Sequence, residues 1–346
     1  LSYTITNDNG KKVKKQYIDE WITDNNMRTY EKCDAIPPPL YCAPDVFNTW
    51  QQSPFYGLDI TPSDPRWRQD AIDKYTEHID VLCNHNSRAA VYVLKWLAQY
   101  IQNPSVKTTH LVFTSAQGVG KTLTFDTYKK MIGGGCYETA SPEQHVWGNF
   151  NGHMFDNSLI ILSEVCQKNQ IDAGGRIKAL ITDARITINQ KNTKAVDINS
   201  HHRFITCTNH PNPIRLEPSD RRNLVIKCSN EKLGDRQYFT DFVEIFEDYN
   251  SLLTLYSYLN DLDIDDWVFR LDPADPITTY QQELMVEHHT SPVTDFFSWW
   301  VGEQVRKGTA IREGDTSAEA RKCPVGCVRA YGSELMSDFQ IYKVKF

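Results

Sequence analysis

Residues 110–122 read HLVFTSAQGVGKT, an apolar run followed by a glycine-bearing loop that ends in a lysine and a threonine. The run at 110–114 predicts a buried strand, and the residues from Lys121 onward are compatible with a helix. A loop between a strand and a helix can curl its backbone N–H groups round an anion, and the helix N-terminus adds a favourable dipole. The stretch therefore predicts a phosphate-binding loop.

Each residue of this loop has an expected task in binding ATP and Mg²⁺. Gly118 and Gly120 allow the turn, Lys121 reaches the outer phosphates, and Thr122 offers a hydroxyl to Mg²⁺. Ser115 stands where the usual pattern has its first glycine, a tolerant position because it begins the turn. The expected nucleotide-binding residues are Ser115, Ala116, Gln117, Gly118, Val119, Gly120, Lys121 and Thr122. The alternative is a chance glycine turn with an exposed lysine, and the flanking strand and helix argue against it.

A second motif, LIILSEV at 159–165, predicts a strand buried on both faces that ends in an acidic residue. A nucleotide-hydrolysing site needs a carboxylate beside the phosphates, to hold Mg²⁺ or to orient the attacking water. Glu164 is therefore the expected catalytic base and, with Thr122, a metal ligand. Ser163 occupies the position of the usual first acid and cannot supply a negative charge, so hydrolysis could be slow. A surface glutamate that caps the strand is the alternative interpretation.

A third motif, FITCTNH at 204–210, predicts another buried strand, which ends at Asn209. An amide at that point can orient the water that attacks the γ-phosphate, although asparagine is also a common turn former. Before it, alternating residues at 185–189 and 194–198 flank a polar turn and predict a β-hairpin. The window 176–203 contains six basic and two acidic residues, so it is locally positive in a chain of net charge −7.

Strands and helices alternate over 106–230, which predicts a three-layer α/β domain built on a parallel sheet. Amphipathic spacing over 61–105 predicts a helical domain before it. The segment 231–346 is expected to begin with one helix over 238–259 and to be helical further on. Residues 1–60 are rich in turn formers, with a helix-like run near Tyr17, and are expected to form a linker or arm that lies over its neighbour.

The chain has 346 residues, of which 40% are hydrophobic and 23% charged, a composition typical of globular proteins. No apolar run is long enough to cross a bilayer, and no signal-like segment opens the sequence. The nine cysteines show no regular framework, which indicates reduced thiols in a cytosolic setting. Cys323 and Cys327 could form half of a metal site, without a second pair nearby. Because the chain begins with Leu1 rather than Met, we expect it to be a piece of a longer protein.

Four blocks of this sequence resemble, in order and spacing, the motifs of superfamily 3 helicases, which are AAA+ replication motors of viruses and plasmids. The blocks are SAQGVGKT, LIILSEV, KALITDARITINQKNTKAVDI and HRFITCTNH. The third block, at 178–198, discriminates best, because a basic hairpin before the sensor strand separates this group from other P-loop families. The sequence most resembles the helicase regions of phage and large-virus primase-helicases and primase-polymerases. The segment YGSELMSDFQIY at 331–342 also resembles the beginning of a winged-helix domain.

The resemblance implies a homo-oligomer, a hexameric ring that hydrolyses ATP between subunits and moves on single-stranded DNA in the cytoplasm of the host cell. A fused N-terminal primase or polymerase domain is also implied. The family pattern assigns Glu164 to Walker B, Asn209 to sensor 1, and Arg221 or Arg222 to the arginine finger that reaches the neighbour's γ-phosphate. The DNA-binding residues implied at the hairpin are Lys191, Asn192 and Lys194.

Two other classes of function remain compatible with these motifs. A loader or switch ATPase would use the nucleotide state without unwinding DNA, and Ser163 modestly favours it. A scaffold would use this region mainly to oligomerise an attached enzyme. Hydrolysis that ignores DNA would favour the loader or switch, and a ring that forms without hydrolysis would favour the scaffold.

Overall fold

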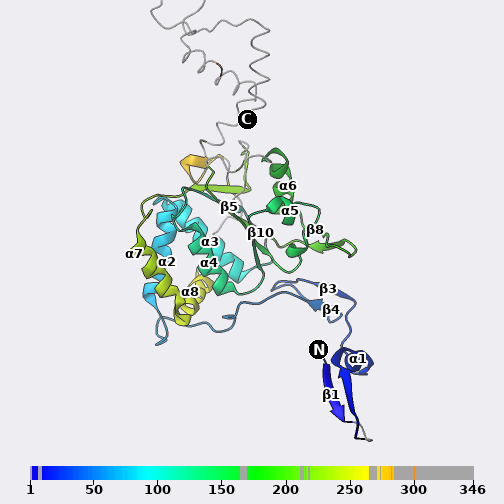
Figure 1. Cartoon of the computed structure of the whole chain (residues 1–346). Coiled ribbons are helices and arrows are strands. Elements are labelled where there is room, and N and C mark those ends of the chain that lie inside the picture. Colours follow the sequence, from blue (N-terminus) through cyan, green and yellow to red (C-terminus); the bar gives the residue numbers. More distant parts are fainter. Residues whose placement is uncertain are drawn as a thin grey trace, which may run out of the picture.

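The computed structural model describes residues 2–6, 10–163, 170–210, 214, 216, 219–264, 271–272, 274–281, 283 and 300. Its centre is a five-stranded sheet in the order β11-β5-β10-β7-β6, and every neighbouring pair is parallel (Figure 1). The strands are β5 His110–Thr114, β6 Cys136–Thr139, β7 Leu159–Ser163, β10 Arg203–Thr208 and β11 Asn223–Lys227. The predicted α/β fold with a parallel sheet is therefore confirmed.

The strand order brings the ends of three motifs to one edge of the sheet. β10 lies between β5 and β7, and Cys207 of β10 pairs with Phe113 on one side and with Ser163 on the other. Because the strands are parallel, the residues that follow β5, β7 and β10 all leave the sheet at its carboxyl edge. The glycine loop after β5, Ser163 and Asn209 consequently meet there.

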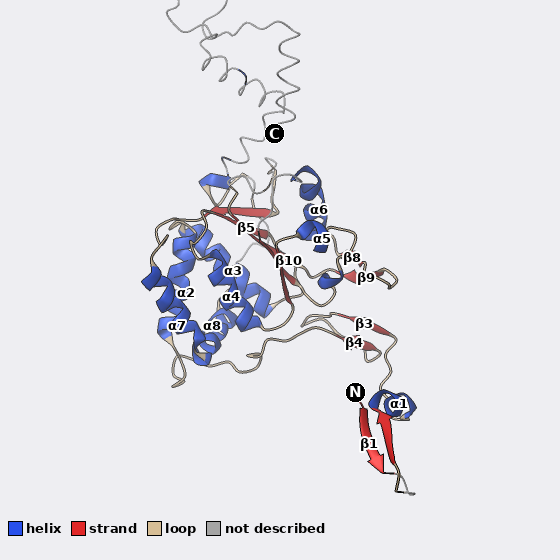
Figure 2. Ribbon diagram, viewed as in Figure 1, coloured by secondary structure: helices blue, strands red, loops and turns tan. Residues whose placement is uncertain are grey.

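Five helices gather on one side of the sheet (Figure 2). They are α2 Gln69–Leu82, α3 Ser87–Gln102, α4 Lys121–Ile132, α7 Arg236–Glu247 and α8 Tyr249–Asp261. Their apolar side chains form one core with the sheet, in which Tyr75, Trp96 and Tyr128 contribute some of the largest buried side chains. Phe113 and Ile161 join this core from the strands.

A second core lies on the opposite face of the sheet. Ile160 and Leu162 of β7 belong to it, whereas Ile161 between them belongs to the first core. This alternation is expected of a strand covered on both faces. The elements near the second core are α5 Pro142–His145, the 3₁₀ turn Gly152–Met154, α6 Gln170–Thr182, β8 Arg185–Ile188 and β9 Val196–Asn199.

The predicted hairpin is confirmed, because β8 and β9 pair antiparallel with Ile188 opposite Val196. The single helix predicted over 238–259 is wrong, because the chain forms α7 and α8 with a break at Asp248. Asp248 has an extended backbone, and its side chain accepts a hydrogen bond from the Asn250 N–H at the start of α8. An aspartate favours such a cap over a helix interior, which explains the break.

The N-terminal segment contains more structure than the sequence predicts. β1 Ser2–Thr6 and β2 Lys12–Gln16 form an antiparallel pair, followed by α1 Tyr17–Thr23 where the helix-like run was expected. A parallel pair, β3 Lys32–Asp34 and β4 Val46–Asn48, comes next. The end of this N-terminal segment packs on α8, since the Ile60 N–H donates to Ser257 Oγ of that helix at 3.0 Å.

Among the described residues, no helix combines the length and the apolar character needed to span a membrane. Several predictions concern residues outside the described ranges. These are the catalytic role of Glu164, the half metal site at Cys323 and Cys327, and the beginning of a winged-helix domain at 331–342.

Candidate functional site

The loop between β5 and α4 has the backbone that its glycines predict. Gly118 and Gly120 adopt φ values of +90° and +98°, in the left-handed region that favours glycine. Gly120 is also tightly packed, because a Cβ atom added there would lie 2.5 Å from His78 Cε1 and 2.9 Å from Phe239 Cε1. α2 and α7 therefore hold the loop from outside the sheet.

Lys121 begins α4 and is only 7% exposed. Its Nζ donates to Ser115 Oγ, to the Ala116 carbonyl oxygen at 3.3 Å and to Asn209 Oδ1 at 3.3 Å. Burial lowers the pKa of Lys121. The three acceptors are uncharged, so within the described residues they orient the ammonium group without neutralising it. The structure thus brings together the lysine and the asparagine that the sequence assigns to one site.

A cavity of about 430 Å³ lies over the loop, within the range of about 300–1,000 Å³ common for ligand sites. Its lining residues include Lys121, Thr122, Ser163 and Asn209, which come from three separate motifs. Phe239 and Val243 of α7 also line the cavity and give it an apolar side. The loop N–H groups and Lys121 fit phosphates, and this apolar side fits a nucleobase. Thr122 offers the cavity a hydroxyl that could hold Mg²⁺.

Sequence reasoning missed Phe239 and Val243, which sit on a helix more than one hundred residues after the loop. Their only sequence signal is the amphipathic spacing of α7, and that spacing does not distinguish a cavity wall from ordinary core.

Ser163, the last residue of β7, also lines the cavity. Its Oγ donates to Oε1 of Glu138 at 3.4 Å, from the neighbouring strand β6. Glu138 forms an ion pair with Lys129 of α4 as well. Sequence reasoning missed Glu138, because β6 is a short edge strand without a motif of its own.

Arg221 and Arg222 lie at the opposite end of the sheet from the loop. They precede β11, which runs parallel to β5, and the Arg222 carbonyl accepts a hydrogen bond of 2.7 Å from the N–H of His110, the first residue of β5. The loop follows the other end of β5, a strand of five residues or about 16 Å at about 3.3 Å per residue. The two arginines therefore lie far from the loop of their own chain.

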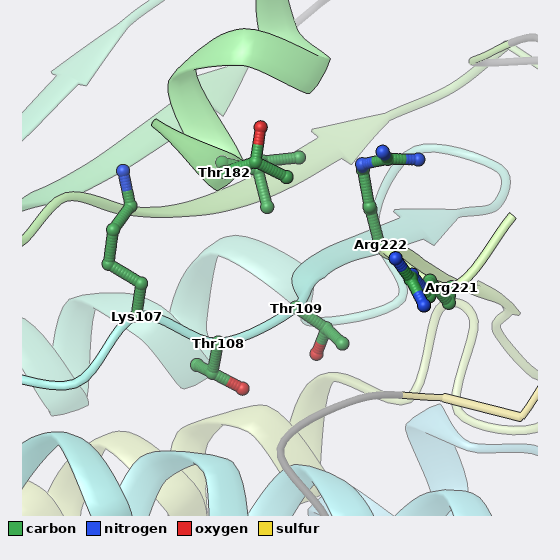
Figure 3. Close-up of a pocket in the computed structure, with 7 residues that line it drawn as sticks. Lys107, Thr108, Thr109, Thr182, Arg221 and Arg222 are labelled. Carbon is green, nitrogen blue, oxygen red and sulfur yellow. The ribbon is translucent and has the colours of Figure 1, made fainter. Parts of the chain in front are cut away.

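A second cavity of about 300 Å³ adjoins these arginines, and Figure 3 shows them together on one side of it with Lys107 on the other. Arg221 is exposed, whereas Arg222 is half-buried and its Nε has no hydrogen-bond partner in the described part of the chain. Burial lowers the pKa of Lys107 to about 8, and its Nζ donates to the Leu180 carbonyl oxygen at 2.6 Å. Arg221 is thus the more accessible of the two guanidinium groups.

The three DNA-binding candidates, Lys191, Asn192 and Lys194, are exposed in the turn between β8 and β9. Asn192 adopts a φ of +64°, a backbone that asparagine tolerates better than most residues. Lys191 Nζ lies 5.4 Å from the centre of the Phe150 ring, which is 44% exposed. Sequence reasoning missed Phe150, an aromatic residue in the polar segment GNFNGH at 148–153, because only the structure shows that it is exposed. The hairpin therefore presents cations beside an aromatic face.

Residues 113–222 match a family of unknown function, DUF5906. A DNA primase-polymerase of Nitratiruptor phage NrS-1 is 28% identical over 224 residues, which cover 59% of this chain and 30% of that protein. The chain thus spans about a third of the length of this relative.

The structural comparison extends over more of the chain. The A form apo structure of the NrS-1 C-terminal region matches with a TM-score of 0.61 at 19% identity, covering 89% of this chain and 76% of that one. Another apo structure of the same region matches with a TM-score of 0.56 at 18% identity, covering 88% and 77%. The chain is therefore similar in sequence to a phage DNA primase-polymerase and shares the fold of that protein's C-terminal region.

Proposed function

We propose that this chain is the ATP-hydrolysing motor of a phage replication protein, an AAA+ ring helicase of superfamily 3 that moves on single-stranded DNA inside the host cell. We further propose that it works fused to a primase or polymerase domain. One observation carries the proposal. The loop with Lys121 and the pair Arg221 and Arg222 lie at opposite ends of the same sheet.

A site that uses both groups must form between two copies of the chain. In a ring, the carboxyl edge of one sheet faces the amino edge of the next, so one subunit's loop meets its neighbour's arginines. An arginine supplied in this way stabilises the charge that develops on the transferred phosphoryl group. Helix α1 exposes four apolar side chains, Tyr17, Ile18, Trp21 and Ile22. Exposed apolar patches mark interaction surfaces, so these side chains support the proposal that the chain assembles into a ring.

Within one subunit, residues of the loop and of the three motifs bind and orient the nucleotide. The loop N–H groups and the Lys121 ammonium hold the phosphates, and Phe239 contacts the base. Asn209 Oδ1 orients the attacking water, and Glu164 accepts a proton from it. Mg²⁺, held by Thr122 and Glu164, would neutralise charge on the phosphate oxygens. Closure against the neighbouring subunit excludes bulk water from the site.

The exposed turn between β8 and β9 is the proposed DNA contact. Lys191 and Lys194 bind backbone phosphates, which gives sequence-independent and salt-sensitive affinity. Phe150 lies beside Lys191 and offers a ring on which a base can stack. Hydrolysis at the subunit interface then moves the hairpin along the axis of the ring.

Mixing subunits tests this proposal. Lys121→Ala removes the loop cation, and the double change Arg221→Ala/Arg222→Ala removes the neighbour's contribution, so each protein alone is expected to be inactive. In an equal, randomly assembled mixture, about a quarter of the interfaces combine an intact loop with intact arginines. We therefore expect DNA-stimulated ATP hydrolysis to return to as much as about a quarter of the wild-type rate. A mixture that assembles into rings and remains inactive would contradict the proposal.

Ser163 gives specific support to the second candidate, a loader or switch ATPase with weak hydrolysis. Steady-state hydrolysis with and without single-stranded DNA separates the two. Turnover that rises with DNA and disappears in Lys121→Ala supports the motor. Slow turnover that ignores DNA supports the loader or switch, and assembly without any hydrolysis supports an oligomerisation scaffold.

A further inference from the structure

Ser163 presents a hydroxyl group to the cavity over the loop, at a position where a carboxylate would bind Mg²⁺ more strongly. Ser163 ends β7 and lines this cavity together with Thr122 and Asn209. Magnesium sites favour carboxylate oxygens, either as direct ligands or as acceptors for the waters round the cation. A hydroxyl alone brings no negative charge to such a site.

Glu138 supplies a carboxylate directly behind this hydroxyl. Glu138 pairs in register with Ile161, which is two residues before Ser163, so the three side chains lie on the same face of the sheet. Ser163 Oγ donates its hydrogen to Glu138 Oε1 at 3.4 Å. With its hydrogen directed at the carboxylate, the Ser163 oxygen keeps its lone pairs for the cavity.

Lys129 fixes the position of this carboxylate. Its Nζ forms ion pairs with Glu138 and, at 2.6 Å, with Asp126. Lys129 belongs to α4, the helix that begins with Lys121 and Thr122. Ser163 and Lys129 both contact the Glu138 carboxylate. The Glu138 side chain is 33% exposed, so solvent still reaches it.

We propose that Glu138 is a positioning residue for the cation of the nucleotide site, and that it acts through the Ser163 hydroxyl. The hydrogen bond to an ionised acceptor strengthens the Ser163 oxygen as an acceptor in turn, as in polarised hydrogen-bond chains. The Ser163–Glu138 pair then takes the place of a single carboxylate at the end of β7. This inference rests on the proposed nucleotide site and identifies a further carboxylate that supports its cation.

The test measures how Mg²⁺ strengthens the binding of a fluorescent AMP-PNP derivative. Glu138→Gln keeps an acceptor for Ser163 but removes the charge. We expect the Mg²⁺ concentration for half of the full effect to rise about tenfold, the lower end of the effect of outer-shell partners at metal sites. Nucleotide affinity in EDTA should remain at the wild-type level, which a merely structural defect would not allow.

Asp126→Asn is the matched control, because it also removes one carboxylate partner from Lys129. It should change the Mg²⁺ requirement less than about twofold. Ser163→Ala should match Glu138→Gln, and adding Glu138→Gln to Ser163→Ala should have no further effect, because the relay is already broken.

The outcomes separate this inference from the proposed function. If wild-type protein binds AMP-PNP and Glu138→Gln behaves like Asp126→Asn, the inference is overturned while the nucleotide site stands. Additive losses in the Ser163→Ala/Glu138→Gln protein also overturn it, since Glu138 would then act independently. A wild-type protein that binds no AMP-PNP, with or without Mg²⁺, overturns the proposed function and this inference with it.

Discussion

Replacing Gly120 with alanine should destabilise the protein much more than the same change two residues earlier. Gly120 has a φ of +98°, and a non-glycine residue in the left-handed region costs about 1–2 kcal/mol. An added Cβ would also lie 2.5 Å from His78 Cε1, far inside the ordinary carbon–carbon contact of about 3.5–4.0 Å. Overpacking of this kind costs about 1–3 kcal/mol. The sum is about 2–5 kcal/mol for Gly120→Ala.

The His78 ring cannot move aside easily. It is fully buried, and its nitrogens are hydrogen-bonded to Tyr238 Oη at 3.0 Å and to the Gly120 carbonyl oxygen at 3.3 Å. Gly118 provides the matched control, with a φ of +90° but with Leu233 Cδ1 at an ordinary 3.5 Å from the added Cβ. Gly118→Ala should therefore lose only the backbone contribution of about 1–2 kcal/mol.

Urea denaturation of the two variants and of the wild type measures this difference. The free energy of unfolding should fall in both variants, and by about 1–3 kcal/mol more in Gly120→Ala. Adding His78→Ala to Gly120→Ala removes the clashing ring, so the double variant should lose less than the sum of its single changes. Equal stabilities for Gly118→Ala and Gly120→Ala, or strict additivity in the double variant, would refute the packing argument.

Lys191→Ala/Lys194→Ala should abolish unwinding and leave nucleotide binding intact. The slope of log affinity for single-stranded DNA against log salt concentration should become shallower by about 1.4. Unwinding at the wild-type rate would refute the hairpin assignment. Lys121→Ala should weaken ATP binding by about 10- to 100-fold in a titration, whereas Lys130→Ala, an exposed lysine at the other end of α4, should not. Burial lowers the pKa of His202 to about 4, so stability should be lost as pH falls from about 6.5 towards 4, by about 2 kcal/mol at pH 5, because only the unfolded chain takes up the proton. Urea denaturation at pH 5 and pH 7 should show a smaller difference in His202→Gln than in the wild type, and an equal difference would contradict this assignment.

The parts of the fold that the sequence predicts are those with a strong local pattern. The strands at 110–114 and 204–208 and the hairpin at 185–198 appear within one or two residues of their expected bounds. Each is a short run of apolar or alternating residues bounded by polar residues, so neighbouring residues determine it. β6 has no such pattern, because only one of its four residues is fully buried. Its strand conformation depends on pairing with β7.

The candidate site divides in the same way. Lys121 and Asn209, each predicted to lie beside the nucleotide phosphates, are motif residues at the start of a predicted helix and at the end of a predicted strand, and the structure brings them into contact. Phe239, Glu138 and Phe150 carry no motif and reach the site through packing of segments distant in the sequence. Site residues without a motif can be identified only when the spatial neighbours of each motif residue are known.

Helix α2 precedes the sheet strands in the sequence and α7 follows them, yet both helices contribute residues to the site. His78 of α2 is hydrogen-bonded to the Gly120 carbonyl and to Tyr238 of α7, and Phe239 on the same helix lines the cavity. The core is also continuous, since Trp96 and Phe242 share one apolar cluster with the sheet residue Phe113. A cut at the predicted boundaries near 105 and 230 would open this core and separate the loop from His78, its buried imidazole neighbour. The loop is therefore linked to α7 by two hydrogen bonds through His78, on a route that does not include the sheet.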